Sequence, residues 1–399
     1  MKKIKIFLLF CLMLIVSINL LANDWEFGSE GGHIVPMNMS NIAIKSEKLH
    51  FKLETTKTKD GTTYHEMVVT VKFVFDSPEA AEKYIGFITP EGGNEEWDNV
   101  DHFKNFRTVV NGKNVSTISY RLTDFIPKDV KQHEEVKKYF KEYDAEKAKQ
   151  ESEYYKKSYV YYFKANFKKG ENVVEHSYRY DGSSGVGLVD FNYVWTTISK
   201  WRNQKVDDFE VIVEPGNSLI AMPVMKTKDG KEISWKLVGE GNVDYGHYFD
   251  TYKKYKILYA KLKNGYLHFR TEDFKPENEF YLTEIVYLNG NYIFPEKTEK
   301  GFKFRDDLTG MAYNAEYLTA EELKEISDSD LKIMRNYPYA FAGYDFSNKE
   351  LKDYFSKFLW YIPTGKNVEL KEYEYDIVKT IDKIINNKKR YSLCFRNRY

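Results

Sequence analysis

Alternation of apolar and polar residues dominates the chain from about residue 42 to residue 295. Short turns interrupt it, and an Asn-Gly or Asp-Gly pair within such a pattern strongly favours a tight β-hairpin turn. The pairs are Asp60-Gly61, Asn111-Gly112, Asp229-Gly230, Asn264-Gly265 and Asn289-Gly290. The pattern predicts antiparallel sheet in which each strand buries one face.

The alternation also predicts which side chains face the core. After the first turn, the apolar residues from Met67 to Phe75 share one face of a strand, and Glu66 and Lys72 are among those on the other. Further strands are predicted at residues 159–167, 174–180, 209–213, 233–237 and 281–287, with a hairpin that pairs 257–262 with 266–270. So many short strands predict one or two β-sandwiches.

Two other parts of the chain have helical patterns. Residues 128–157 are highly charged with a narrow apolar stripe, which predicts a surface helix, either a solvated insertion or a partner-binding helix. Near the C-terminus, Thr319 to Glu322 and Ser347 to Glu350 have the form of capping boxes and predict helix starts. A third helix is expected after Asn367.

A proline interrupts the helical pattern of residues 335–346, RNYPYAFAGYDF. A helix that begins near Ser329 should kink or end before Pro338, because proline has no N–H and its ring crowds the preceding turn. Gly343 suits the left-handed conformation that ends a helix. We therefore expect a structural corner at this point of the chain.

The predicted fold class is α+β, with a β-sandwich-type antiparallel body of one or two sandwiches, a helical insertion and a small C-terminal helical domain. The predicted segments are a signal peptide (1–22), a first β-rich half (23–127), the insertion (128–158), a second β-rich half (159–296), a linker (297–317), the helical domain (318–390) and a tail (391–399).

The N-terminus has the pattern of a secretory signal. Three lysines precede an apolar run that closes on Ala22, which predicts cleavage after this residue and export to a periplasm or the outside of the cell. A retained membrane anchor is the alternative, although the run is short for a span. Because the full chain has a formal charge of +0, loss of the three lysines leaves −3. Such a balance gives no reason to expect a nucleic-acid partner.

No local motif predicts catalysis, a metal site or a cofactor. The eight histidines lack paired ligand spacing, and Gly182 to Gly187 fits neither a phosphate loop nor a nucleophile elbow. Asp328 and Asp330 suit a helix N-terminus better than a calcium loop. Only Cys394 would remain after signal cleavage, so no intrachain disulfide is expected.

The C-terminal region resembles the YARHG domain, a small domain of exported bacterial proteins. The matching residues are Tyr339-Ala340-Phe341-Ala342-Gly343, preceded by Arg335-Asn336 and followed by Tyr354-Phe355 and Trp360-Tyr361. Phe341 and Ala342 stand where the family has the arginine and histidine of its name. Chemistry that depends on those two side chains is therefore not expected here.

Residues 23–290 resemble an exported bacterial β-rich family of unknown function. The resemblance rests on Gly31-Gly32, on the segment from Ile42 to Leu49 that contains Ser46-Glu47, and on Trp195 and Trp201. It implies fold and compartment, and no activity.

From these features we predict an exported cell-envelope protein without catalytic activity, which acts as a binding or structural module and has no stable membrane span after cleavage. Its expected partner is a cell-wall polymer or another envelope protein, met by exposed rings of Tyr344, Trp360 and Tyr361, unless these pack the helical core. The alternative function is an envelope hydrolase of wall glycan or peptide, with Glu95, Glu96 and Asp98 as candidate acids. A third is a self-associating structural protein.

Overall fold

The computed structural model describes residues 30–31, 33–36, 41–57, 63–88, 92–93, 103–121, 155–157, 159–184, 188–195, 198–199, 201–224, 226–227, 229–246, 256–277, 279–286, 296–298, 301–303, 324–370 and 372–396. The predicted signal peptide, most of the charged insertion and the first capping box lie outside the described residues. In the described part, no helix is both long and apolar enough to cross a membrane.

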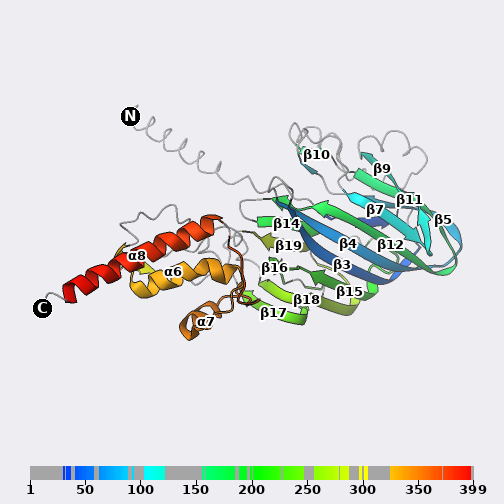
Figure 1. Ribbon diagram of the computed structural model, residues 1–399. Helices are drawn as coiled ribbons and strands as arrows, with labels where there is room; N and C mark the ends of the chain where they lie inside the picture. The colour runs from blue at the N-terminus through cyan, green and yellow to red at the C-terminus, as the bar shows by residue number, and fades with distance from the viewer. Residues whose placement is uncertain are drawn as a thin grey trace, which may run out of the picture.

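Most of the described chain is β-strand (Figure 1). The strands are β1 (Glu30–Gly31), β2 (His33–Pro36), β3 (Ala43–Lys57), β4 (Thr63–Ser77), β5 (Ala81–Ile88), β6 (Gly92–Gly93), β7 (Lys104–Val110), β8 (Lys113–Val115), β9 (Ile118–Arg121), β10 (Tyr155–Lys157), β11 (Tyr159–Phe167), β12 (Gly170–Asp181), β13 (Ser183–Ser184), β14 (Leu188–Tyr193), β15 (Val206–Glu214), β16 (Leu219–Pro223), β17 (Lys236–Gly246), β18 (Ile257–Phe274), β19 (Phe280–Ile285), β20 (Glu296–Thr298) and β21 (Gly301–Lys303). The helices are α6 (Asp328–Phe341), α7 (Lys349–Phe355) and α8 (Glu372–Arg396).

One large sheet of 13 strands forms the body, in the order β1-β14-β19-β16-β18-β15-β3-β4-β12-β7-β8, with β13 on β14 and β17 on β18. Its pairs are antiparallel except β15 with β3 and β1 with β14. A second sheet of 4 strands has the order β2-β5-β11-β9.

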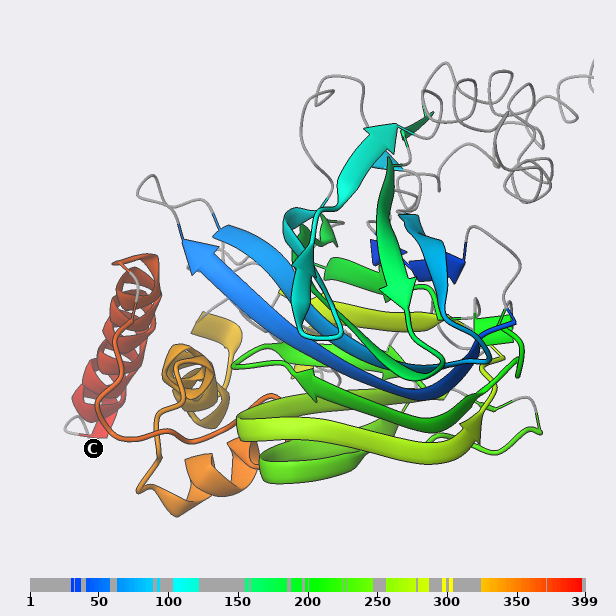
Figure 2. The same ribbon diagram turned by 90° about the vertical axis from the view of Figure 1, so that its right-hand side faces the viewer.

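The two sheets and the two ends of the large sheet enclose a common core. The Phe51 ring in β3 contacts the Phe280 ring in β19 at 4.7 Å between centroids, so the sheet curves back over its own middle (Figure 2). The Phe163 ring in β11 meets His176 of β12 at 5.3 Å, which joins the small sheet to the same core. The predicted α+β class and β-sandwich-type body are confirmed.

The hairpin predicted at Asn264-Gly265 is wrong, because residues 257–274 form the single long strand β18. A β-bulge lies at this point: Glu240 of β17 pairs with Asn264, whereas Gly241 pairs with Leu262. The φ angles of Gly239 and Gly265 are +124° and +90°, and a Cβ on Gly265 would lie 2.0 Å from the Val238 carbonyl oxygen. The glycines therefore let two backbones approach closely, and β18 bends so that its first part pairs with β16 and its second with β15.

The turn predicted at Asn111-Gly112 is confirmed. Asn111 and Gly112 have φ angles of 49° and 78° and join β7 to β8, as expected for a type I′ hairpin turn. Strands β3 and β4, which flank Asp60-Gly61 in the sequence, pair antiparallel. The turns predicted at Asp60-Gly61 and Asn289-Gly290 themselves lie outside the described residues. Residues 155–157, predicted as the end of the helical insertion, form strand β10 instead, paired with β6.

Helix α6 continues through Pro338 to Phe341, so the alternative that the helix ends before this proline is wrong. Pro338 lies in the last turn of the helix, where it removes only the hydrogen bond to the Met334 carbonyl, and Tyr337, Pro338 and Ala340 are buried and hold that turn in place. Gly343 closes the helix with a φ of +81°, as predicted.

The ends of the other helices differ slightly from the prediction. Asn348 caps α7 by accepting a hydrogen bond from the Leu351 N–H, in place of the expected Ser347. Helix α8 runs to Arg396, into the range that was predicted as a tail.

Candidate functional site

The rings of Trp360 and Tyr361, predicted to meet a ligand, are 4% and 3% exposed. The Trp360 ring lies 4.4 Å from that of Phe341, and the Tyr361 hydroxyl donates to the Tyr344 carbonyl oxygen at 2.7 Å. Tyr344 itself is half-buried. Because stacking on a sugar needs an accessible ring, Trp360 and Tyr361 fit the packing role that the sequence left as the alternative.

The space beside Gly343 is filled by the chain's own residues. A Cβ at this position would lie 2.6 Å from Thr364 Oγ1. The Thr364 N–H donates to the Gly343 carbonyl oxygen at 2.8 Å, and the Asp345 N–H donates to that of Gly365 at 2.7 Å. The residues at the motif therefore form a closely packed corner.

The helical domain packs on the β-rich body, as Figure 1 shows at one end of the sheet. One hydrophobic cluster contains Leu219 of β16 and Tyr259 of β18 together with Leu331 and Tyr337 of α6. The Asn242 side chain of β17 donates to the carbonyl oxygens of Leu359 and Tyr361 at 2.9 and 3.2 Å. The two parts thus share a core.

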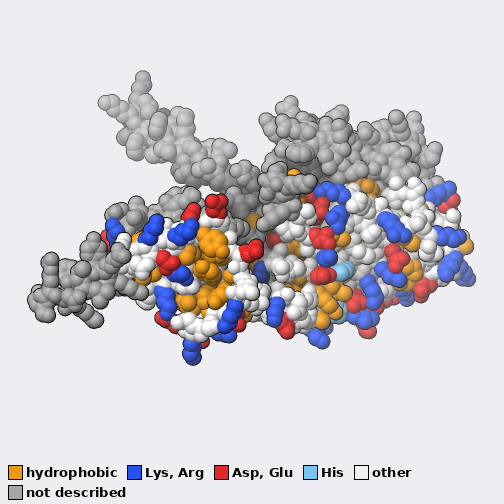
Figure 3. All heavy atoms as spheres, in the orientation of Figure 1, with side chains coloured by type: hydrophobic (Ala, Val, Ile, Leu, Met, Phe, Trp, Pro, Cys, Tyr) orange, Lys and Arg blue, Asp and Glu red, His pale blue; other side chains and the backbone are white. Residues whose placement is uncertain are grey.

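Figure 3 shows where charged and hydrophobic side chains gather on one face of the molecule. Acidic and basic side chains are interspersed over the body, whereas hydrophobic side chains gather over the helical domain around α6. Half-buried rings of this domain include those of Tyr339, Phe341 and Tyr354.

A polar groove of about 630 Å³ lies on the body, in the size range of small-ligand sites. We call it the polar groove. Its lining comes from three separate segments, which a β-bridge between Thr227 and Pro276 helps to bring together. The lining residues are Asn203, Lys205, Thr227, Asp229, Lys231, Thr271, Glu272, Asp273 and Lys275.

The charges of the polar groove are only partly paired. Lys205 bonds to Asp273 and lies 3.4 Å from Asp207. Within the described part of the chain, Lys231 and Lys275 form no ion pair at salt-bridge distance, although the pKa of Asp229 is lowered, mainly by its hydrogen bond with Thr227 and to a smaller extent by the Lys231 charge. Asp273 in the lining has a strained backbone with a φ angle of 53°, and so does Gln204, between the lining residues Asn203 and Lys205, with a φ angle of 50°. Strained residues of this kind are typical of functional sites.

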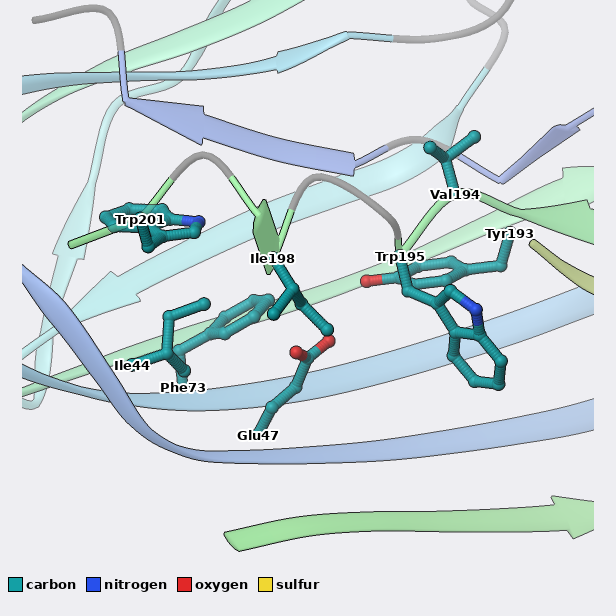
Figure 4. A pocket seen from close by; sticks show the side chains of 8 residues that line it. All are labelled: Ile44, Glu47, Phe73, Tyr193, Val194, Trp195, Ile198 and Trp201. Atoms are coloured by element: carbon teal, nitrogen blue, oxygen red, sulfur yellow. The ribbon is translucent and has the colours of Figure 1, made fainter. Parts of the chain in front are cut away.

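A second, smaller cavity surrounds the carboxyl group of Glu47 in β3 (Figure 4). Its volume is about 10 Å³, close to the space of one water molecule. Glu47 is 2% exposed, and burial raises its pKa to about 8. The residues around it are Ile44, Phe73, Tyr193, Val194, Trp195, Ile198 and Trp201. Glu47, Trp195 and Trp201, all part of the second sequence resemblance, therefore meet at one place.

Hydrogen bonds join strand β3 to the segment between β14 and β15 beside this cavity. A bulge between Ile44 and Ser46 shifts the register of β3 on β4. The Asn203 side chain accepts from the Ile44 N–H at 3.1 Å and donates to the Ile44 carbonyl oxygen at 2.8 Å. Asn203 thereby links the Glu47 cavity to the polar groove, which it also lines.

A part-buried polar cluster joins strands β4, β18 and β19 and the residue that precedes β16. Glu284 Oε2 lies 2.7 Å from His65 Nδ1, and the Ser218 hydroxyl donates to Glu284 Oε1 at 2.6 Å. Burial lowers the pKa of nearby Lys261 to about 8, against the opposing effect of the Glu284 charge. The serine bonds to the carboxylate and not to the imidazole, so the cluster lacks the serine-to-histidine bond of a catalytic triad.

The structure leaves the predicted acids of the hydrolase alternative untested, because Glu95, Glu96 and Asp98 lie outside the described residues. In the part that is described, no group of three or more histidine, cysteine or acidic side chains is placed to hold a metal ion. Asp328 and Asp330 lie in the first turn of α6, and Ser327 caps that helix.

Comparisons with known proteins give one family match. The sequence profile of the YARHG domain matches residues 308–386, and this domain is found in exported proteins. No curated protein matches the sequence.

Two solved structures resemble the chain distantly. One is a Legionella pneumophila protein provisionally described as nutrient binding, with 16% identity, a TM-score of 0.49, and coverage of 90% of this chain and 98% of that one. Another is a two-domain M1 zinc metallopeptidase mutant bound to L-tryptophan, with 7% identity, a TM-score of 0.24, and coverage of 61% and 42%. The sequence match and the helical packing agree on the C-terminal part: this chain carries a YARHG domain, joined to a β-rich body.

Proposed function

We propose that the chain is an exported, non-catalytic binding protein of the bacterial envelope. In this proposal the ligand is a small polar molecule with charges of both signs, such as a soluble fragment of the cell-wall polymer, and it binds in the polar groove. In this proposal the YARHG domain stabilises the body by packing on it. The predicted signal peptide and the occurrence of YARHG domains on exported proteins support the compartment.

The observation that carries the proposal is the polar groove itself. Lys231 and Lys275 offer ammonium groups to a ligand carboxylate, and Glu272 offers an acceptor to an amine or hydroxyl group. Its volume suits a ligand of several sugar or amino-acid units. Trp360 and Tyr361 of the YARHG domain fit a ligand role less well, since both are buried.

Calorimetry with soluble wall fragments tests the proposal. We expect saturable binding by the mature protein, and about tenfold weaker binding for Lys231→Glu and Lys275→Glu, because each reversal places a negative charge opposite the ligand carboxylate. Lys113→Glu is the matched control, because Lys113 is an exposed lysine on β8, outside the groove. Equal binding by all three variants would place the ligand elsewhere, and no binding by the wild type would refute the proposal.

The hydrolase alternative has a separate readout. Insoluble wall material incubated with the mature protein should release no new reducing ends or amino groups if the protein only binds. Release that disappears in an alanine variant of Glu95, Glu96 or Asp98 would favour the enzyme. Sizing of the purified protein separates the self-associating alternative from both.

A further inference from the structure

Glu47 is an acidic residue that lies within the hydrophobic core. Its side chain lies on the core-facing side of β3 with Leu49 and Phe51, and it is 2% exposed. Its Oε2 atom has no hydrogen-bond partner in the described part of the chain. Burial of a carboxylate without a counter-charge is strongly unfavourable, so such groups hold a proton or meet a cation.

The walls of the cavity are almost entirely apolar and aromatic. Phe73, Tyr193, Trp195 and Trp201 supply four rings, and in Figure 4 the Glu47 carboxyl group and the Tyr193 hydroxyl point into the space between them. Aromatic faces attract cations through their quadrupole. A carboxyl group among aromatic rings is therefore better suited to a cation than to an anion.

The size and donor set of the cavity restrict the cation. A volume of about 10 Å³ admits one water-sized particle. Metal ions of the common hard type need several oxygen ligands, and among the described lining residues only Glu47 and Tyr193 carry side-chain oxygens. An ammonium ion instead has N–H groups that donate hydrogen bonds to carboxylate oxygens. Its positive charge is also attracted to the faces of aromatic rings. We propose that the Glu47 cavity binds an ammonium ion, with Glu47 as its counter-ion.

Binding would exchange one cation for another. Glu47 releases its carboxyl proton to solvent as the ammonium ion enters, and the carboxylate and ammonium then form a neutral pair. The groups that face Glu47 remain neutral, because the pKa values of Tyr178 and Tyr193 are raised well above their usual range, mainly by burial. Glu47 is the only acidic or basic residue among the described lining residues. Just outside the lining, the Glu279 carboxylate accepts a hydrogen bond from the Trp195 backbone N–H at 2.8 Å and contributes to the raised pKa of Tyr193.

Titration of the mature protein with ammonium chloride in weakly buffered solution at pH 7 tests the site. With the Glu47 pKa near 8, we expect saturable release of about 0.9 proton per protein, and an apparent affinity about tenfold higher at pH 7 than at pH 6. Tetramethylammonium chloride, which is too large for the cavity, should release none. Glu47→Gln, which keeps the side-chain shape, should abolish release, whereas the partly exposed control Glu175→Gln should retain it.

Two results would overturn the proposal. One is the absence of proton release and of saturable ammonium binding, which would leave a protonated Glu47 beside a buried water. The other is equal release with tetramethylammonium or in Glu47→Gln, which would show that ordinary salt effects on surface groups cause it.

Discussion

Replacement of Glu47 by Gln should stabilise the protein in a pH-dependent way. Burial raises the pKa of Glu47 from 4.5 to about 8, so the folded chain holds a proton that the unfolded chain loses above pH 4.5. Stability is therefore lost as pH rises through this window, by about 1.4 kcal/mol per pH unit. Glutamine has a similar shape and no titrating group. At pH 7 the variant should gain about 3 kcal/mol, and above pH 8 about 5 kcal/mol.

Urea denaturation followed by tryptophan fluorescence measures this difference. Wild type and Glu47→Gln are compared at pH 5, 7 and 8.5 in ammonium-free buffer, and the difference in unfolding free energy is plotted against pH. Glu175→Gln is the control, because Glu175 is partly exposed and pairs with Lys72 on the surface. Its effect should stay within about 1 kcal/mol at every pH.

The shape of the curve decides the outcome. A difference that rises from pH 5 to pH 8.5 supports a buried carboxyl group that has to ionise without a partner. A flat difference, or destabilisation of the variant at high pH, would show that Glu47 has a counter-charge in the fold, and the reasoning about its cavity would then be wrong.

Three further predictions concern other parts of the molecule. Gly343→Ala should lower the unfolding free energy by about 1 to 2 kcal/mol, measured in urea, because Gly343 has a φ of +81° and an added Cβ would contact Thr364. The control is Gly365→Ala, whose Cβ would meet no atom within 4 Å, and equal effects of the two substitutions would contradict the prediction. Burial lowers the pKa of His176 to about 3, so the stability of the fold should be lost as pH falls below 6.5. An NMR titration should find the His176 imidazole neutral down to pH 4, and a titration midpoint near 6.5 would refute this prediction. A chain ending at residue 322 should expose Leu219 and Tyr259 and bind the dye ANS more strongly than the full chain; an unchanged signal would mean that the body does not need the YARHG domain.

The sequence predicted best what depends on neighbouring residues. Asn111-Gly112 forms its hairpin turn because both φ angles are positive, a requirement that the two residues meet by themselves. Asn264-Gly265 has the same form, yet it lies within a long strand, because Gly239 from another strand packs against it. That partner is distant in the sequence, so the local pattern could not reveal it.

The same limit applies to Pro338 and to the aromatic residues of the C-terminal domain. Proline lowers helix stability locally, but the burial of Tyr337 and Ala340 against the body and the other helices keeps the last turn helical. The spacing of Trp360 and Tyr361 could not distinguish an exposed ring from a core ring, because the surface that covers them comes partly from β16 and β18.

Both candidate sites depend on the tertiary structure. Glu47 and Trp195 both belong to the second sequence resemblance, but only the fold brings β3 against the segment after β14. The polar groove had no sequence signal except the turn at Asp229-Gly230, since its lining comes from three separate segments.

Hydrogen–deuterium exchange with and without soluble wall fragments tests the location of binding most directly. The account predicts slower exchange at residues 226–232 and at the end of β18 near Asp273 and Lys275, with little change at Trp360 and Tyr361. Protection confined to the YARHG domain, with none at the polar groove, would contradict it.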